Sequence, residues 1–200
     1  MTSIGDSAFF GCSGLTSIAI PDSVTSIGEG AFSGCSGLTA IEVSADNPTY
    51  RSENNCLIEM ETNALIAGCK TSIIPKGVTS IGSWAFVDCS GLTAVRITDS
   101  VTSIGDGAFY NCRGLTAIAI PDSVTSIGDS AFWDCSGLTS IRIPDSVTSI
   151  GDLAFSSCSG LTSIEYAGTK AQWIAIEKGP YWYPNIGDYV VVHCTDGDLD

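Results

Sequence analysis

The sequence predicts an α/β repeat fold, a right-handed solenoid of parallel strands with short helical turns. One apolar pattern recurs every 23 residues, and its cleanest copy, Leu115 to Gly137, reads LTAIAIPDSVTSIGDSAFWDCSG. Each copy offers only about seven apolar side chains, too few to offset the conformational entropy lost when its backbone becomes ordered. The copies must therefore bury their apolar faces against one another, and we expect a continuous core along the stack.

The period and the opening of each copy are those of leucine-rich repeats. Such repeats are 20–29 residues long and open with L-x-x-L-x-L, and Leu115, Ile118 and Ile120 fill these three positions. Copies begin at Leu15, Leu38, Cys69, Leu92, Leu115, Leu138 and Leu161. The repeats are thus expected over residues 1–166. Met1 falls in the column of Val24, so the first repeat is partial and the chain is expected to be a fragment.

Each regular repeat divides into three short segments. Alternating apolar residues in 115–120 predict a parallel strand, Pro121 and Asp122 predict a turn, and residues 124–127 predict a second extended segment. Asp129 precedes SAFWDC, where an acidic side chain suits the start of a short helical turn. Strands should therefore dominate, with one helical turn in every repeat.

The repeat at residues 38–68 is irregular, because it has 31 residues and lacks the usual second half. Its sequence CLIEMETNALIAG contains two apolar runs separated by Glu61, Thr62 and Asn63, which predicts a β-hairpin. We expect this hairpin to stand out from the regular stack.

The last segment, residues 167–200, is predicted to cover the end of the solenoid. Thr169 and Gln172 have the spacing of a helix capping box, and Gly179 with Pro180 marks a stop. Ala171, Ile174 and Ala175 fall on one face of the helix between, and residues 189–194 read as a closing strand. Repeat arrays need such an end piece to keep the last core face from water.

Charge and hydropathy exclude several classes of partner. Eight basic residues against twenty-two acidic ones give a net charge of −14, so nucleic acid would be repelled. The apolar runs are much shorter than the ~20 residues that a membrane span requires, and no targeting signal opens the chain. We expect neither nucleic-acid binding nor membrane insertion.

The nine cysteines do not form a metal-binding pattern. Six of them form one column, in which a small apolar side chain suits the core better than a metal or redox ladder would: Cys12, Cys35, Cys89, Cys112, Cys135 and Cys158. The chain has one histidine and no C-x-x-C, which argues against zinc. Cys56 and Cys69 flank the hairpin, and their pairing in an oxidised chain remains an alternative.

Other polar groups are expected to serve structure instead of catalysis or metal binding. His193 and Cys194 are neighbours on a strand and point to opposite faces, which is wrong for a base and its nucleophile. Asp196, Asp198 and Asp200 alternate like the start of a calcium loop, but a solvated acidic tail is the favoured interpretation. Turn formation and helix capping are likewise favoured over calcium binding for two acidic columns: Asp22, Asp99, Asp122 and Asp145; and Asp6, Glu29, Asp106, Asp129 and Asp152. No catalytic residue, metal site or cofactor is predicted.

The candidate binding residues occupy positions of the repeat at which the residue type differs from copy to copy, while the apolar positions stay the same. On the outer side of the strands the candidates are Glu42, Arg96, Arg142 and Glu165; after the phenylalanine column they are Tyr110 and Trp133, with Trp84 nearby. Large aromatic residues and arginine carry much of the energy of protein interfaces. The alternative is neutral drift, with the aromatic side chains lying flat on neighbouring repeats.

The motifs AFxxCxGL and IPxSVTSIG resemble those of the BspA-like leucine-rich repeat family of bacterial and trichomonad surface proteins. The resemblance covers roughly residues 1–166, and the tail GTKAQW…VVHCTDG is similar to segments found beside such repeats in gut bacteria. It implies a cell-surface or secreted parent protein that binds proteins or mediates adhesion, without catalysis or a cofactor. A passive spacer in a larger surface protein is the alternative function.

The start of the chain supplies no polar cap before the strand that begins at Leu15. An uncovered solenoid end exposes apolar side chains and unpaired strand groups. We therefore expect fraying or weak self-association through this N-terminal edge.

Overall fold

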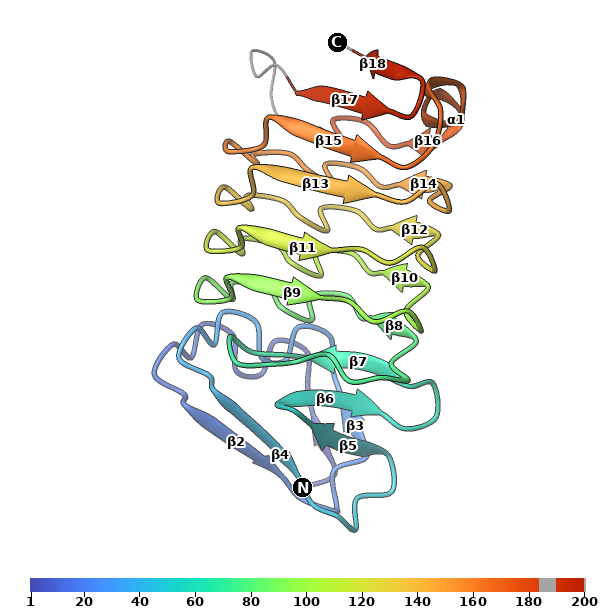
Figure 1. Ribbon diagram of the computed structural model, residues 1–200. Coiled ribbons are helices and arrows are strands. Elements are labelled where there is room, and N and C mark those ends of the chain that lie inside the picture. The colour runs from blue at the N-terminus through green and yellow to red at the C-terminus, as the bar shows by residue number, and fades with distance from the viewer. Residues whose placement is uncertain (184–189, 200) are drawn as a thin grey trace.

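The chain winds into a β-solenoid in a computed structural model that describes residues 1–183 and 190–199 (Figure 1). Its regular turns each contribute two parallel strands. The longer strands are β2 (Ser17–Ile20), β4 (Ala40–Val43), β9 (Ala94–Arg96), β11 (Ala117–Ala119), β13 (Ser140–Ile143) and β15 (Ser163–Tyr166). The two-residue strands are β1 (Ser3–Ile4), β3 (Ser26–Ile27), β8 (Ser80–Ile81), β10 (Ser103–Ile104), β12 (Ser126–Ile127) and β14 (Ser149–Ile150).

The strand register confirms the 23-residue phase of the repeats. Ile104 pairs with both Ile81 and Ile127, and Arg142 pairs with Glu165. The repeat beginning at Cys69 therefore has the phase expected of it, because β8 aligns with β10. The partial first repeat is also in phase, since the Ser23 hydroxyl donates to the Met1 carbonyl as Ser123 does to Val101.

The apolar columns fill the interior of the stack, as the pattern predicts. Leu115, Ile118 and Val124 are buried. The phenylalanine rings lie parallel in a column, with centroids 5.1 Å apart for Phe86 and Phe109 and 5.3 Å apart for Phe109 and Phe132. Each ring thus covers the next, which explains why one repeat cannot be stable alone.

The expected helical turns in the AFxxC segments are absent from the described residues, where the only helix lies near the C-terminus. These segments are successive tight turns, in which Trp84 and Asp88 have φ values of 59° and 58°. The left-handed residues interrupt any helix and direct alternate N–H groups toward the next repeat. Thus Trp84 donates to the Asp106 carbonyl and Phe86 to the Ala108 carbonyl, both at 2.8 Å. The fold is a β-solenoid, not an α/β repeat.

The acidic column before these segments links repeats instead of capping helices. The Asp106 Oδ1 atom accepts a hydrogen bond from the Asp129 N–H at 2.9 Å, and the Asp129 Oδ1 atom accepts from Asp152 at 2.8 Å. Asp6 does the same for Glu29. Each carboxylate thus satisfies a backbone donor one turn further along the stack.

The cysteine column is explained by packing together with a weak hydrogen bond. None of the nine cysteines forms a disulfide, and Cys56 and Cys69 are both buried free thiols. The Cys112 Sγ donates to the Phe86 carbonyl at 3.0 Å, and Cys135 and Cys158 repeat this contact. A thiol suits this column because it is small and apolar and still satisfies a buried carbonyl.

Burial suppresses ionisation of these thiols. It raises the pKa of Cys56, Cys89 and Cys158 from 9.0 to about 12. The unfolded chain ionises them at lower pH, so their contribution to stability is complete below pH 9.0 and lost as pH rises toward about 12. We expect the free energy of unfolding, measured by denaturant titration, to fall over this window.

A thiol reagent at pH 8 should accordingly react with exposed Cys12 and half-buried Cys194 in the folded chain, and with all nine thiols after denaturation. Nine fast thiols before denaturation would contradict the burial. Blocked thiols in the denatured, unreduced chain would contradict the absence of disulfides.

A three-stranded meander replaces the second half of the irregular repeat. It consists of β5 (Tyr50–Glu53), β6 (Cys56–Glu59) and β7 (Ala64–Ala67). The hairpin of β6 and β7 is confirmed, whereas β5, which pairs antiparallel with β6, was not expected. No strand forms at residues 71–74.

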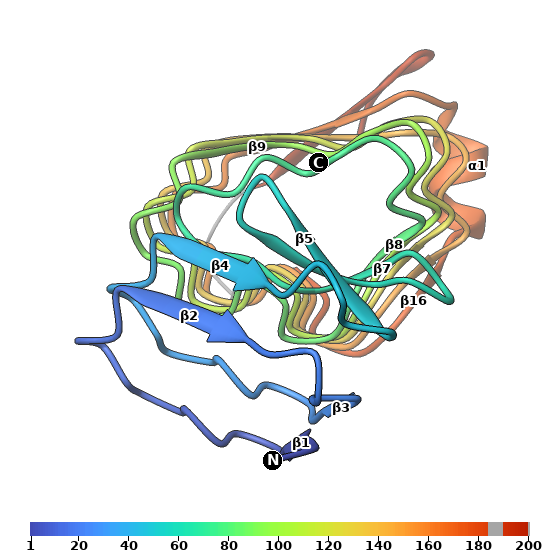
Figure 2. The ribbon, with the colours of Figure 1, turned by 90° about the horizontal axis from the view of Figure 1, so that it is seen from below.

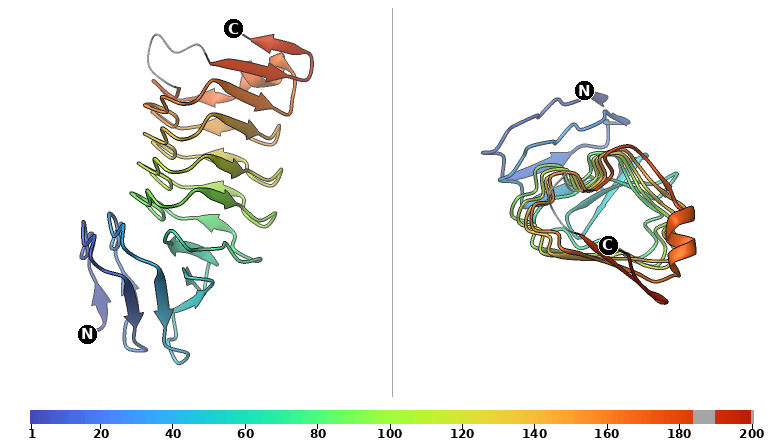
Figure 3. Two further views of the ribbon diagram at one scale, coloured as in Figure 1. Left: turned by 60° about the vertical axis from the view of Figure 1, so that its left-hand side comes forward. Right: turned by 90° about the horizontal axis from the view of Figure 1, so that it is seen from above.

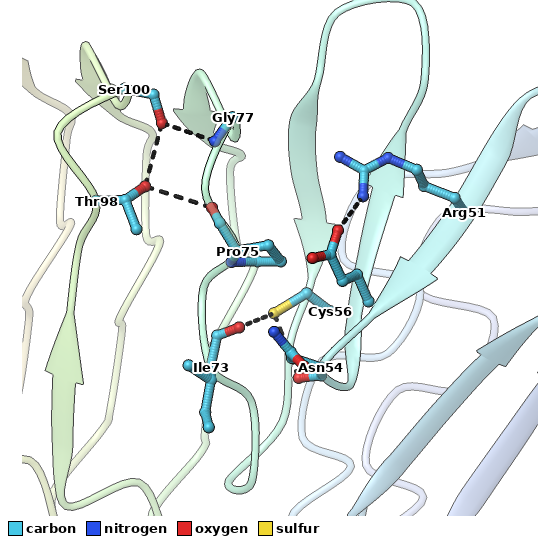
Figure 4. Close-up of polar contacts among 9 residues, drawn as sticks. Arg51, Asn54, Cys56, Ile73, Pro75, Gly77, Thr98 and Ser100 are labelled. Atoms are coloured by element: carbon cyan, nitrogen blue, oxygen red, sulfur yellow. Dashed lines mark hydrogen bonds and ion pairs between the residues drawn. The ribbon is translucent and has the colours of Figure 1, made fainter.

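Side-chain and backbone contacts hold the meander to the first regular turn (Figure 4). The Cys56 Sγ donates to the Ile73 carbonyl at 3.6 Å. One turn further, Thr98 donates to the Pro75 carbonyl, and the Ser100 hydroxyl accepts from the Gly77 N–H at 3.1 Å. The irregular repeat is therefore bonded to the stack despite its different shape.

The core is divided in two at β6, so the expectation of one continuous core is wrong. Alternate residues of β6 face opposite sides: Leu57 belongs to the N-terminal cluster of apolar side chains, and Cys56 and Ile58 belong to the larger C-terminal one. All three are fully buried. The first turns, with β2 and β4, lie to one side of the main stack and are tilted against it (Figures 2 and 3).

The C-terminal segment closes the stack differently in detail from the expectation. The predicted capping box is present at Thr169 and Gln172, and the helix α1 spans Lys170–Ala175. The three residues expected on one face of this helix, Ala171, Ile174 and Ala175, are exposed, and Trp173 is the buried residue. β16 (Glu177–Lys178) follows α1 and pairs with β14. Trp173 faces inward because its ring packs against Tyr166, with centroids 5.1 Å apart.

The closing strand β17 (Val191–Cys194) pairs parallel with β15, and β18 (Gly197–Leu199) pairs antiparallel with β17. The predicted start of the closing strand, Tyr189, lies outside the described residues. Asp196 and Asp198 are exposed, as a solvated acidic segment would be, and both also form contacts within the chain: Asp196 accepts from the Lys170 N–H at 2.8 Å and Asp198 contacts His193. Asp200 lies outside the described residues.

The N-terminal edge has the features that motivate the self-association prediction. Within the described residues, β1 and β2 are the outermost strands of their sheets. Met1 and Phe10 are exposed, the latter by 67%. Association through this edge stays a prediction.

Candidate functional site

The outer face of the longer strands carries three of the four predicted charged residues on one sheet. Arg96, Arg142 and Glu165 are exposed on β9, β13 and β15, and the register aligns Arg96 with Ala119, Ala119 with Arg142, and Arg142 with Glu165. Glu42 is also exposed, but it lies on β4, which pairs only with β2. The structure thus separates Glu42 from the other three.

Ion pairs already engage much of this strand face. Arg142 pairs with Asp122 at 3.1 Å, and the His193 Nε2 lies 3.9 Å from Glu165. The His193 Nδ1 contacts Asp198 at 2.8 Å, and this hydrogen bond raises the pKa of His193 above its ordinary value of 6.5. Charges that satisfy one another within the chain contribute little toward a partner.

The three predicted aromatic residues form a continuous ladder across neighbouring turns. The ring centroids of Tyr110 and Trp133 are 4.5 Å apart with planes 13° apart, and those of Trp84 and Tyr110 are 5.6 Å apart at 58°. All three are half-buried. They lie on neighbouring repeats, as the alternative interpretation expected, while part of each side chain remains accessible.

The Trp84 indole packs against a glycine in the next repeat, Gly107. A Cβ atom on Gly107 would lie 2.3 Å from the Trp84 ring, so only glycine leaves room for the indole. Trp84 itself has φ 59°, a conformation that bulky residues rarely adopt. The indole is therefore tightly positioned beside Tyr110.

The aromatic ladder borders a hollow that we name the junction cleft. Its volume is about 500 Å³. It is lined by Asp6, Ser7, Phe10, Glu29, Gly30, Ser33, Trp84, Val87, Asp88 and Tyr110. The lining residues come from the first two turns and from the first two turns of the regular stack, so the cleft lies where the two cores meet.

The cleft exists because one AFxxC segment is missing. The turns directly before and after it place such a segment on this face, but the irregular repeat continues there as β7 and Gly68. Gly68 leaves room for the Phe86 ring, since a Cβ atom at position 68 would lie 2.0 Å from it. The space outside is not filled, which leaves the turn segment around Glu29 separated from that around Trp84.

Of the cleft residues, the sequence predicts only Trp84 and Tyr110 as binding residues. Four of the others carry an aromatic ring or a charge: Phe10, Asp6, Glu29 and Asp88. The sequence favours helix capping for Asp6 and Glu29, which the structure replaces by a link between repeats. The available signal was the 31-residue repeat, because the loss of one segment from a ladder predicts a gap beside its neighbours.

A second hollow of about 430 Å³ lies on the strand face where residues 71–74 form no strand. Ile73, Ala94, Arg96, Ala117 and Ala119 contribute to its lining. Ile73 is 69% exposed. Arg96 thus borders a hollow on the strand face.

Comparison with known sequences identifies the repeat. The pattern that describes the BspA type leucine rich repeat region matches in six copies, over residues 1–58 and 57–174. This chain belongs to the BspA-type leucine-rich repeat family. A comparison with curated proteins gives no significant match.

Several bacterial structures are similar to this BspA-type chain. A leucine-rich cell surface protein from Faecalibacterium prausnitzii is 38% identical, with a TM-score of 0.66, over 88% of this chain and 54% of that one. A leucine-rich repeat protein from Eubacterium ventriosum is 24% identical, with a TM-score of 0.74, over 100% of this chain and 67% of that one. The pneumococcal vaccine antigen PcpA shares the fold, at 20% identity and a TM-score of 0.76, over 94% and 50%. The chain thus spans about half the length of the F. prausnitzii protein and of PcpA.

Two further features of the described residues bear on function. No helix among them has the length and apolar character needed to cross a membrane. Within residues 1–183 and 190–199, no group of three or more His, Cys, Asp or Glu side chains is arranged to hold a metal ion.

Proposed function

We propose that this chain is a non-catalytic protein-binding or adhesion module of a cell-surface or secreted bacterial protein. The observation that carries the proposal is the aromatic ladder of Trp84, Tyr110 and Trp133 beside the junction cleft. Accessible aromatic rings next to a hollow are typical of protein interfaces. The family and the F. prausnitzii cell surface protein support the same role.

Binding of the fluorescently labelled chain to intact bacterial and epithelial cells would test this function. We expect saturable binding that is lost when proteases strip the cell surface. The double variant Trp84→Ala, Tyr110→Ala should bind at least about 30-fold more weakly, since a single interface hot spot is worth about 2 kcal/mol or more.

The matched control is Ile174→Ala, which removes an exposed side chain on the cap, far from the ladder in sequence. It should bind like the unmodified chain. A chain that binds no cell surface, or one whose ladder variant binds as well as the control, would favour the passive spacer.

A further inference from the structure

The junction cleft combines aromatic rings with uncompensated negative charge. Phe10 lines it together with Trp84 and Tyr110. Asp6, Glu29 and Asp88 supply three carboxylates, and no lysine, arginine or histidine is among the lining residues. None of the five ion pairs in the described residues involves these carboxylates. Asp88 accepts a hydrogen bond from the Asn111 amide and Asp6 accepts one from the Glu29 N–H, but no cationic group among the described residues neutralises these carboxylates.

The pKa of Tyr110 is affected by the same negative charge. Burial raises the pKa of its hydroxyl, and the carboxylates of Asp88 and Asp134 raise it further. Negative charge beside an aromatic ring disfavours another anion and favours a cation at the ring face.

A second acidic hollow on the molecule provides an internal comparison. It also measures about 500 Å³ and is bordered by Asp106, Asp129, Asp152 and Glu177. Its other lining residues are serine, isoleucine and glycine, so no aromatic ring faces it. The two hollows have similar size and acidity, and the rings distinguish the junction cleft.

We propose that the junction cleft binds the cationic side chain of an arginine or lysine presented by a protein partner. This proposal rests on the protein-binding function proposed above and names the chemistry that the partner must offer. Trp84 and Tyr110 place aromatic rings in the wall of the cleft, where a guanidinium or ammonium group can contact them. Asp6, Glu29 and Asp88 provide the charge that neutralises it, and arginine's planar group suits both kinds of contact.

The direct test is an NMR titration of the isotopically labelled chain with the peptide acetyl-Gly-Gly-Arg-Gly-Gly-amide. The matched peptide carries citrulline, whose urea group has nearly the shape of guanidinium without its charge. We expect the arginine peptide to shift the Trp84 indole signal and the amide signals of the cleft, and to bind about tenfold more tightly than the citrulline peptide. Binding should weaken with added salt.

Two double variants, each lacking two negative charges, distinguish binding in the cleft from nonspecific attraction to an acidic protein. Asp6→Asn, Glu29→Gln keeps a side-chain oxygen at position 6 to accept from the backbone, and it should weaken peptide binding about tenfold. Asp129→Asn, Asp152→Asn removes the same charge from the hollow without aromatic rings and should leave binding unchanged. Equal binding of both peptides, or equal losses in both variants, would overturn the proposal, as would stronger shifts of the cleft signals with the neutral sugar maltohexaose.

The cell-binding assay distinguishes failure of this proposal from failure of the proposed function. If the Asp6→Asn, Glu29→Gln variant binds cells like the unmodified chain, the cleft is not the cation site, while the adhesion function stands. If the unmodified chain binds no cell surface but still binds the arginine peptide in the cleft, the adhesion function fails and the cation site stands.

Discussion

Replacing Phe109 with alanine is expected to lower the free energy of unfolding by about 3–5 kcal/mol. Its side chain is fully buried, and its ring stacks between Phe86 and Phe132 at 5.1 and 5.3 Å. The substitution leaves a cavity in the middle of the stack, which neighbouring turns cannot fill because hydrogen bonds fix their spacing. Denaturant unfolding followed by circular dichroism would measure the loss.

Phe10→Ala is the matched control for this prediction. Phe10 precedes an AFxxC-type cysteine as Tyr110 does, but it is 67% exposed. Its replacement should change the free energy of unfolding by less than about 0.5 kcal/mol. Similar losses for the two variants would contradict the assignment of Phe109 to the core.

Leu57→Ala and Ile58→Ala are expected to destabilise different parts of the molecule. Each should cost about 2–5 kcal/mol, because both side chains are fully buried. Leu57 packs in the N-terminal cluster and Ile58 in the C-terminal one. Hydrogen exchange measured by segment should therefore accelerate mainly in residues 1–50 for Leu57→Ala, and mainly in the turns from residue 78 onward for Ile58→Ala.

The pair tests whether β6 separates two cores. If both variants accelerate exchange uniformly along the chain, the two clusters unfold as one cooperative unit. In that case β6 would separate the two clusters in space, but the two clusters would not unfold independently.

The strands and core columns were predictable because they depend on apolar periodicity. Leu115 and Ile118 recur at fixed spacing, and the paired registers follow from that spacing. The AFxxC segments were misinterpreted, because an acidic residue before a short apolar run also suits a helix. The column of Asp88 held the better signal: it reads Gly, Gly, Asp, Asn, Asp and Ser, residues that tolerate positive φ.

The candidate site was predictable in part. The variable columns yielded Trp84, Tyr110 and Trp133, and these rings do meet. The 31-residue repeat indicates a gap in the ladder, but the shape of the cleft depends on how two cores are arranged around β6, which no spacing encodes. The burial of Trp173 in place of Ile174 has a similar origin, since contact with Tyr166 fixes the orientation of α1.

The identical step between successive turns has a consequence for how such a chain can change in length. Asp106 bonds to Asp129 and Phe109 packs on Phe132, their counterparts one repeat away, and the Cys112 thiol bonds to the Phe86 carbonyl of the preceding repeat. The two cut surfaces of any regular turn are therefore complementary. After loss or duplication of a whole turn, the flanking turns would still pack on matching surfaces, and the core of the stack would stay buried. Gain or loss of 23 codons in the gene would thus change the distance between the meander of β5, β6 and β7 and the C-terminal segment. The structure of either part would not have to change.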